Sequence, residues 1–127
     1  MIRGVRKIVV PVSDQDGAKE FWTNRVGFEV IQDSQFGDNG RWLEVTPPDR
    51  GVVLVLSPRR PDEAPRGVPD QLPHSDVFFA CDDIQATYGA LTRRGVRFHT
   101  PPTKMPFGWW SMFEDNEGTR YALGEFS

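Results

Sequence analysis

The side chains best suited to binding chemistry are two tryptophans in matching places of a repeated pattern. Trp42 closes the segment Gly40-Arg41-Trp42, and Trp110 closes Gly108-Trp109-Trp110. An indole ring can stack on a planar ligand or lie over a cation, and each such contact contributes on the order of 0.5–2 kcal/mol. We therefore expect an aromatic binding site. The sequence leaves open the alternative that both rings are only part of the hydrophobic core.

Residues for nucleophilic or phosphate chemistry are scarce. The chain holds two histidines and one cysteine, Cys81. His99 stands just before Thr100-Pro101-Pro102, and neither Cys81 nor Ser111 has a recognisable histidine partner in the sequence. No Gly-rich phosphate loop is found either. The sequence therefore does not indicate a serine or cysteine nucleophile.

The composition narrows the class of protein. A chain of 127 residues, 38% hydrophobic and 26% charged, is typical of one soluble globular domain. The net charge is −3 and its Lys and Arg residues are scattered, so nucleic acid and anionic membranes are not expected partners. A lone cysteine suits a reducing compartment, and neither a signal peptide nor a stretch of transmembrane length is recognisable. We expect a cytoplasmic protein.

The elements that must position the two tryptophans are predicted twice. Asp14 and Gly27 recur as Asp82 and Gly95, each pair displaced by 68 positions (14 to 82 and 27 to 95). A helix-like stretch lies between the members of each pair, and a strand-like run follows each glycine. An internal repeat of this kind predicts a duplicated half-domain with a cavity where the two copies face each other.

The first copy has the pattern βαβββ. Ser13 or Asp14 can cap a helix through a side-chain oxygen, and Gly27 can end it in a left-handed conformation. Between them, apolar residues recur at helical spacing. The expected strands are residues 8–12, 28–34, 41–46 and 51–57, with Pro11 indicating a sheet edge or a strand end.

The second copy repeats this order after a proline-rich segment. Residues 59–74 are predicted to link a first module, 1–58, to a second module, 75–127. The proline-rich loop 58–73 could be a plain tether or a lid. In the second module Asp82 or Asp83 caps the helix, the strands are 76–81, 96–99, 109–114 and 119–124, and residues 100–107 form a second proline-rich loop.

A tandem βαβββ repeat with these signatures resembles the vicinal oxygen chelate superfamily, which includes glyoxalase I, extradiol dioxygenases and bleomycin-resistance proteins. The resemblance implies an α+β fold in which two modules form curved sheets around a central cavity, and it implies a homodimer. The residues that carry it are Val12-Ser13-Asp14, Ala18, Phe21-Trp22, Val26-Gly27-Phe28, Cys81-Asp82-Asp83-Ile84, Arg94-Gly95-Val96, Pro106-Phe107-Gly108 and Phe113-Glu114-Asp115-Asn116-Glu117-Gly118.

The resemblance also implies where a metal would be bound. The enzymatic members hold a divalent cation through four side chains, and counting from the motifs places these at Lys7, Val55, Asp76 and Ala122. Only Asp76 offers a donor, because an ammonium repels a cation and aliphatic groups have no lone pair. His74 shares that strand, but one His and one Asp do not form a four-ligand cage. We expect no metal and no cofactor, as in the metal-free bleomycin-resistance-like branch.

Those four positions also determine which residues of each strand would face the cavity, because side chains alternate along a strand. A slip of one residue would invert this assignment. The predicted ligand-binding residues are Trp42, Glu44, Val53, Val55, Phe78, Trp109, Trp110, Met112 and Arg120.

The resemblance and these residues together predict capture of a small aromatic or amphipathic ligand, such as an antibiotic, without a metal. One alternative is an enzyme of this fold, a glyoxalase-like lyase, an isomerase or a dioxygenase, using Glu44, Asp76 and Lys7 as acid–base groups or a metal through unrecognised ligands. Aromatic neighbours would then raise the pKa of Glu44 toward neutrality. Lys7 could instead pair with Asp76 or Glu44 structurally, and a non-catalytic dimerisation module is a further alternative.

Overall fold

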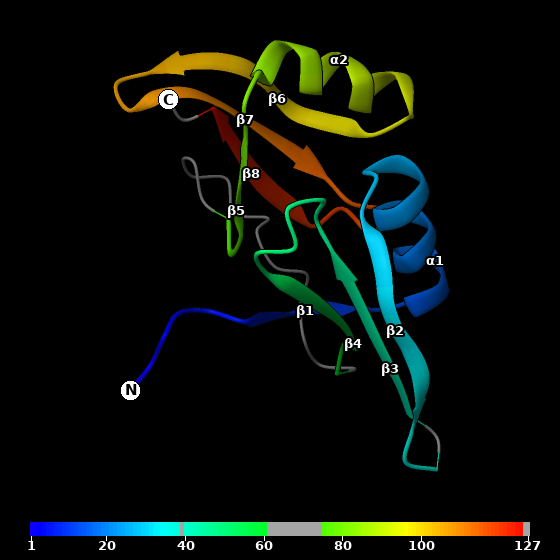
Figure 1. The fold of residues 1–127 in the computed structure, drawn as a ribbon. Coiled ribbons are helices and arrows are strands. Elements are labelled where there is room, and N and C mark those ends of the chain that lie inside the picture. The colour runs from blue at the N-terminus through cyan, green and yellow to red at the C-terminus, as the bar shows by residue number, and fades with distance from the viewer. Residues whose placement is uncertain (39, 61–74, 126–127) are drawn as a thin grey trace. The chain divides into compact units, whose positions relative to one another are not determined.

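The computed structural model describes residues 1–38, 40–60 and 75–125. The chain divides into two compact units, Met1–Glu63 and Ala64–Ser127. In the described ranges each unit contains a four-stranded sheet and helical segments, so the predicted α+β fold class is confirmed (Figure 1). Within these ranges no helix is long and apolar enough to span a membrane.

The first unit is built around one mixed sheet. Its strands lie in the order β1-β4-β3-β2, with β1 and β4 parallel and the other pairs antiparallel (Figure 1). The elements are β1 (Lys7–Val12), α1 (Gln15–Glu20), the π-helical turn η1 (Phe21–Arg25), β2 (Glu29–Phe36), β3 (Gly40–Thr46) and β4 (Val53–Pro58).

The second unit repeats this topology. Its strand order is β5-β8-β7-β6, again with one parallel pair, β5 with β8. The expected tandem βαβββ arrangement is therefore present. The elements are β5 (Phe78–Cys81), α2 (Ile84–Arg93), β6 (Arg97–Met105), β7 (Gly108–Glu114) and β8 (Arg120–Glu125). The predicted linker falls mainly in residues 61–74, outside the described residues, and the tether and lid alternatives lie there too.

The helices begin and end at the residues predicted to do so. Asp14 caps α1 and Asp83, rather than Asp82, caps α2, each through a side-chain oxygen that accepts a backbone amide. Gly27 and Gly95 follow the helical segments with φ of 94° and 89°, a left-handed conformation that glycine adopts without steric cost.

A polar network attaches α1 to the first sheet. The Arg41 guanidinium binds Asp33 on β2 at 2.8 Å and Asp16 on α1 at 2.6 Å. Lys19 of α1 reaches the same Asp33 carboxylate at 2.8 Å. Hydrogen bonds from these two cations hold the pKa of Asp33 well below its usual range. The side chain of Arg41 therefore identifies the face of β3 that α1 covers.

The sequence prediction for residues 96–107 was wrong in one respect. A short strand followed by a proline-rich loop was expected, but β6 continues through Pro101 and Pro102 to Met105. Two circumstances allow prolines there. β6 is the outer strand of its sheet, where a missing amide need not break a ladder, and its pairing with β7 shifts register on either side of Thr100.

Candidate functional site

The predicted site residues of the first unit lie on the face of the sheet that α1 does not cover, here called the helix-free face. Glu44 is opposite Val55, and Lys7 is opposite Val53. Because side chains alternate, these four share a face opposite to that of Arg41. The strand phase is the one expected from the sequence.

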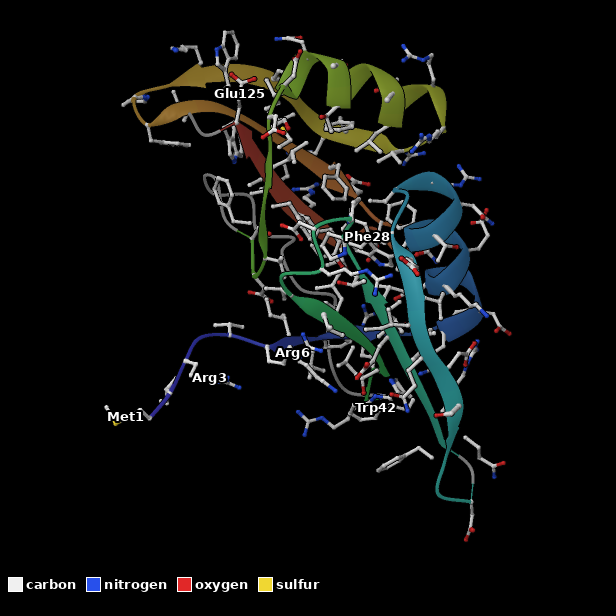
Figure 2. All side chains as sticks on the ribbon, viewed as in Figure 1. Met1, Arg3, Arg6, Phe28, Trp42 and Glu125 are labelled. Carbon is white, nitrogen blue, oxygen red and sulfur yellow. The ribbon has the colours of Figure 1, made fainter. Side chains whose placement is uncertain are left out.

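A compact polar cluster forms on this face from Lys7, Trp42 and Glu44. The Lys7 ammonium lies 2.6 Å from Glu44 Oε2, and the Trp42 indole N–H donates to the same oxygen at 2.7 Å. The ammonium also lies 5.6 Å from the centre of the Trp42 ring. The Glu44 side chain is only 5% exposed, whereas that of Lys7 is 43% exposed. Figure 2 places Trp42 on the first sheet. The ion pair of Lys7 with Glu44, one of the alternatives for Lys7, is therefore present.

The pKa of Glu44 is lowered, contrary to the sequence expectation. Burial by itself raises this pKa, but the hydrogen bonds from Lys7 and Trp42 lower it by more. The expectation treated Trp42 only as an apolar neighbour. Its indole N–H is in fact a donor to the carboxylate, so the aromatic residue stabilises the charged form.

Phe36 extends the aromatic surface and was missed from the sequence. Its ring centre lies 5.6 Å from that of Trp42, and the residue is 63% exposed. The strand was expected to end at Ser34, whereas β2 continues to Phe36. Alternation onward from Ser34, which is opposite Trp42, would have placed Phe36 on the same face.

The second unit has a helix-free face of different character. Tyr88 of α2 packs on Phe98, and Phe98 packs on Phe113. Phe113 and every second residue of β7 from it therefore lie on the face that α2 covers. The other face carries an apolar cluster of Trp110, Met112 and Ala122, with Met105 packed against it. Phe78, opposite Ala122, is 46% exposed.

The structure separates the two neighbouring tryptophans of β7. Trp109 and Trp110 are consecutive in the strand, so their rings lie on opposite faces. Trp109 lies below the ammonium of Lys104 at 5.5 Å, and Trp110 belongs to the apolar cluster. Of this pair, therefore, only Trp110 lies on the helix-free face with the other predicted site residues of β7.

The two repeat-related tryptophans also differ in hydrogen bonding. Trp110 is 5% exposed, and its indole N–H has no acceptor among the residues that the structure describes. Farther along the same face, Arg120 and Glu114 lie opposite each other with Nε and Oε1 3.6 Å apart. The sequence repeat predicted equivalent positions for the rings and carried no sign of this difference.

The positions at which the superfamily's enzymes would bind a metal do not form a ligand set here. Lys7 is an ion-paired ammonium, and Val55 and Ala122 have no donor atom, so these side chains do not fit a divalent cation. Asp76 is exposed in a bend before β5, not within the strand, and His74 is outside the described residues. In the described ranges no three His, Cys, Asp or Glu side chains gather to hold a metal ion. Metal independence stays a prediction.

The two units share the βαβββ order and the same strand order, and each has a helix-free face. This arrangement is the one expected from the sequence resemblance. Residues 4–123 match the Glyoxalase/Bleomycin resistance protein/Dioxygenase superfamily. The chain belongs to this superfamily, as the sequence resemblance predicted.

Individual relatives match over nearly their whole lengths. TnmS3, an antibiotic binding protein from Streptomyces sp. CB03234, is 35% identical, with a TM-score of 0.83 over 99% of this chain and 98% of its own. A superfamily member from Sphaerobacter thermophilus DSM 20745 is 32% identical, with a TM-score of 0.84 over 98% of both chains. YetH of Bacillus subtilis (strain 168) is 35% identical over 125 residues, 98% of this chain and all of YetH.

Proposed function

We propose that this protein captures a small aromatic or amphipathic molecule, such as an antibiotic, on the aromatic helix-free faces of its sheets and without a metal. The observation that carries the proposal is the Lys7–Trp42–Glu44 cluster with Phe36 beside it. An aromatic surface with a few oriented polar groups is typical of sites for small molecules. The 35% identity to the antibiotic binding protein TnmS3 supports the same class of ligand.

The charges of the cluster support metal independence. The Lys7 ammonium holds Glu44 Oε2 at 2.6 Å, so the carboxylate of this face is already neutralised by a fixed cation. A divalent cation brought to the same place would be repelled by the ammonium. Val55 and Ala122 supply no compensating ligand.

Acid–base catalysis by Glu44 is disfavoured on the same geometry. A general acid or base works best with a pKa near the operating pH, but the pKa of Glu44 is shifted downward. Its Oε2 also already accepts two hydrogen bonds, from Lys7 and from Trp42. The carboxylate is better suited to orienting the indole ring and the ammonium toward a ligand.

A fluorescence screen tests the proposal. Quenching of tryptophan emission is followed while bleomycin, doxorubicin and other aromatic antibiotics are titrated into wild type, Trp42→Ala and Trp110→Ala. We expect saturable quenching at one site per chain, unaffected by EDTA and weakened at least about tenfold in one or both variants. Trp109→Ala, whose ring lies on the other face of β7, is the matched control.

Two results would overturn the proposal. Stoichiometric binding of Zn, Ni, Mn or Fe(II) at micromolar affinity would contradict the metal-free site. Quenching that is unchanged in both Trp42→Ala and Trp110→Ala would remove the helix-free faces as the binding surface.

A further inference from the structure

The Trp110 indole N–H is a buried donor without an acceptor in the described part of the chain. Its nitrogen is inaccessible to solvent, and the residue as a whole is 5% exposed. Buried N–H groups in folded proteins are nearly always hydrogen-bonded, because leaving one unpaired costs its full desolvation energy. A donor of this kind on a helix-free face calls for an acceptor from outside the described residues.

The neighbours of Trp110 explain why its indole N–H has no acceptor among the described residues. In the first unit the acceptor for Trp42 is Glu44, two residues farther along the same strand. The equivalent position in the second unit, two residues after Trp110, is Met112. A thioether is a weak acceptor at best, so the second copy keeps the indole donor and has lost its carboxylate.

A second donor lies at the other end of the same face. Arg120 Nε is also buried without a hydrogen bond in the described residues, and Glu114 Oε1 lies 3.6 Å away, beyond hydrogen-bonding distance. The Arg120–Glu114 pair is four residues from Trp110 along β7, roughly 13 Å. Between the two donors lie the apolar side chains of Met112 and Ala122.

We propose that Trp110 is a specificity-determining residue whose indole N–H donates a hydrogen bond to a carbonyl oxygen of a planar aromatic ligand, while Met112 and Ala122 contact the ring of that ligand. The inference rests on the proposed function and adds the chemical class of the ligand, an aromatic ketone or quinone. A cationic aromatic ligand is disfavoured because it would place positive charge near the Arg120 guanidinium. A plain aromatic hydrocarbon is disfavoured because it would offer the indole N–H no acceptor. A site built around a buried donor rejects ligands that lack the acceptor.

A matched pair of probes tests the inference. Fluorenone and fluorene are planar tricycles that differ in a single carbonyl oxygen, and the affinity of each is measured by tryptophan quenching. Wild type is expected to prefer fluorenone by about tenfold or more. Trp110→Phe keeps an aromatic ring but removes the N–H, so the preference should disappear. Trp109→Phe, whose ring lies on the other face of β7, is the matched control and should retain it.

A gain-of-acceptor variant provides a second route that leaves Trp110 in place. Met112→Gln puts an amide oxygen where Glu44 stands relative to Trp42, so it should occupy the Trp110 N–H from within the chain. The preference for fluorenone should then fall to near unity. In ¹H–¹⁵N spectra the Trp110 indole proton should move downfield on adding fluorenone to wild type, and should already lie downfield in free Met112→Gln.

The outcomes separate this inference from the proposed function. Equal affinity of wild type for the two probes, or a preference that survives in both Trp110→Phe and Met112→Gln, would overturn the role of the indole N–H. Failure of wild type to bind fluorenone while antibiotics still quench it would do the same and leave the proposed function intact. If no aromatic compound quenches wild type, the proposed function fails as well.

Discussion

Glu44 is the residue on which the polar part of the first helix-free face depends. Its carboxylate is almost fully buried and accepts hydrogen bonds from the ammonium of Lys7 and the indole of Trp42. Removing a partner from a buried charge generally costs more than the pair contributes, because the remaining group stays desolvated. Lys7 is partly exposed, however, which moderates the cost in this case.

The substitution Glu44→Gln is expected to lower the free energy of unfolding at pH 7 by about 1–2 kcal/mol, since Gln keeps an acceptor for Trp42 but loses the charge opposite Lys7. The pKa of Glu44 in the folded protein is lowered. Its stabilising contribution is therefore fully present above the ordinary Glu pKa of about 4.3 and is lost as the pH falls through the lower folded value. Urea unfolding at pH 7 and near pH 3 should show the two proteins converging in acid.

A matched control is Glu29→Gln. Its ion pair with Arg50 joins side chains that are 61% and 60% exposed, so solvent screens it and the expected effect is below about 0.5 kcal/mol. An equal loss in both variants would show that the Glu44 pair is no stronger than a surface pair.

At the scale of elements, the β2–β3 hairpin positions both aromatic rings of the first face. Phe36 is opposite Gly40, and Trp42 follows two residues later on the same face. A Cβ on Gly40 would lie 2.3 Å from the Phe36 carbonyl oxygen, a distance that real Cβ atoms do not show. Glycine is required at position 40 because the backbones of the two strands approach closely there. The requirement does not come from the φ angle of the residue.

The substitution Gly40→Ala is accordingly expected to destabilise the protein by about 1–3 kcal/mol, since a strand must shift to admit the methyl group. It should also disturb the Phe36–Trp42 contact and so weaken ligand quenching. Gly51→Ala is the control, because its added Cβ would meet only the Asp49 carboxylate at an ordinary 3.5 Å. Urea unfolding of both variants checks the prediction, and similar midpoints would contradict it.

At the scale of the whole molecule, two units of the same strand order carry faces of different chemistry. One has a carboxylate that accepts a hydrogen bond from its tryptophan, and the other has an apolar cluster in which the tryptophan finds no acceptor among the described residues. The duplication thus preserved the fold while the polar partners diverged.

The homodimer implied by the resemblance remains a prediction at this scale. Val5 and Val9 are 66% and 61% exposed, and β1 is an outer strand of its sheet, so apolar surface is available for association. Sedimentation equilibrium is expected to give a mass of about twice the 14.4 kDa of one chain at micromolar concentration. A mass of one chain up to the highest soluble concentration would contradict it.

The features that the sequence determined by itself are local or periodic. Asp14 with Gly27 and Asp83 with Gly95 delimit the helices because capping and left-handed glycine depend on neighbouring residues only. The repeat of these signals along the chain was sufficient to predict the tandem βαβββ fold, the superfamily and the phase of β3.

The tertiary structure decided what depends on neighbours distant in sequence. Residues 100–105 form a strand because β6 lies at a sheet edge, which no local pattern records. The pKa of Glu44 falls because Lys7, 37 residues away along the chain, reaches its carboxylate. Trp42 and Trp110 look equivalent in sequence, yet only the contacts around each indole decide which N–H has an acceptor, because a hydrogen bond needs a partner within about 3 Å in space.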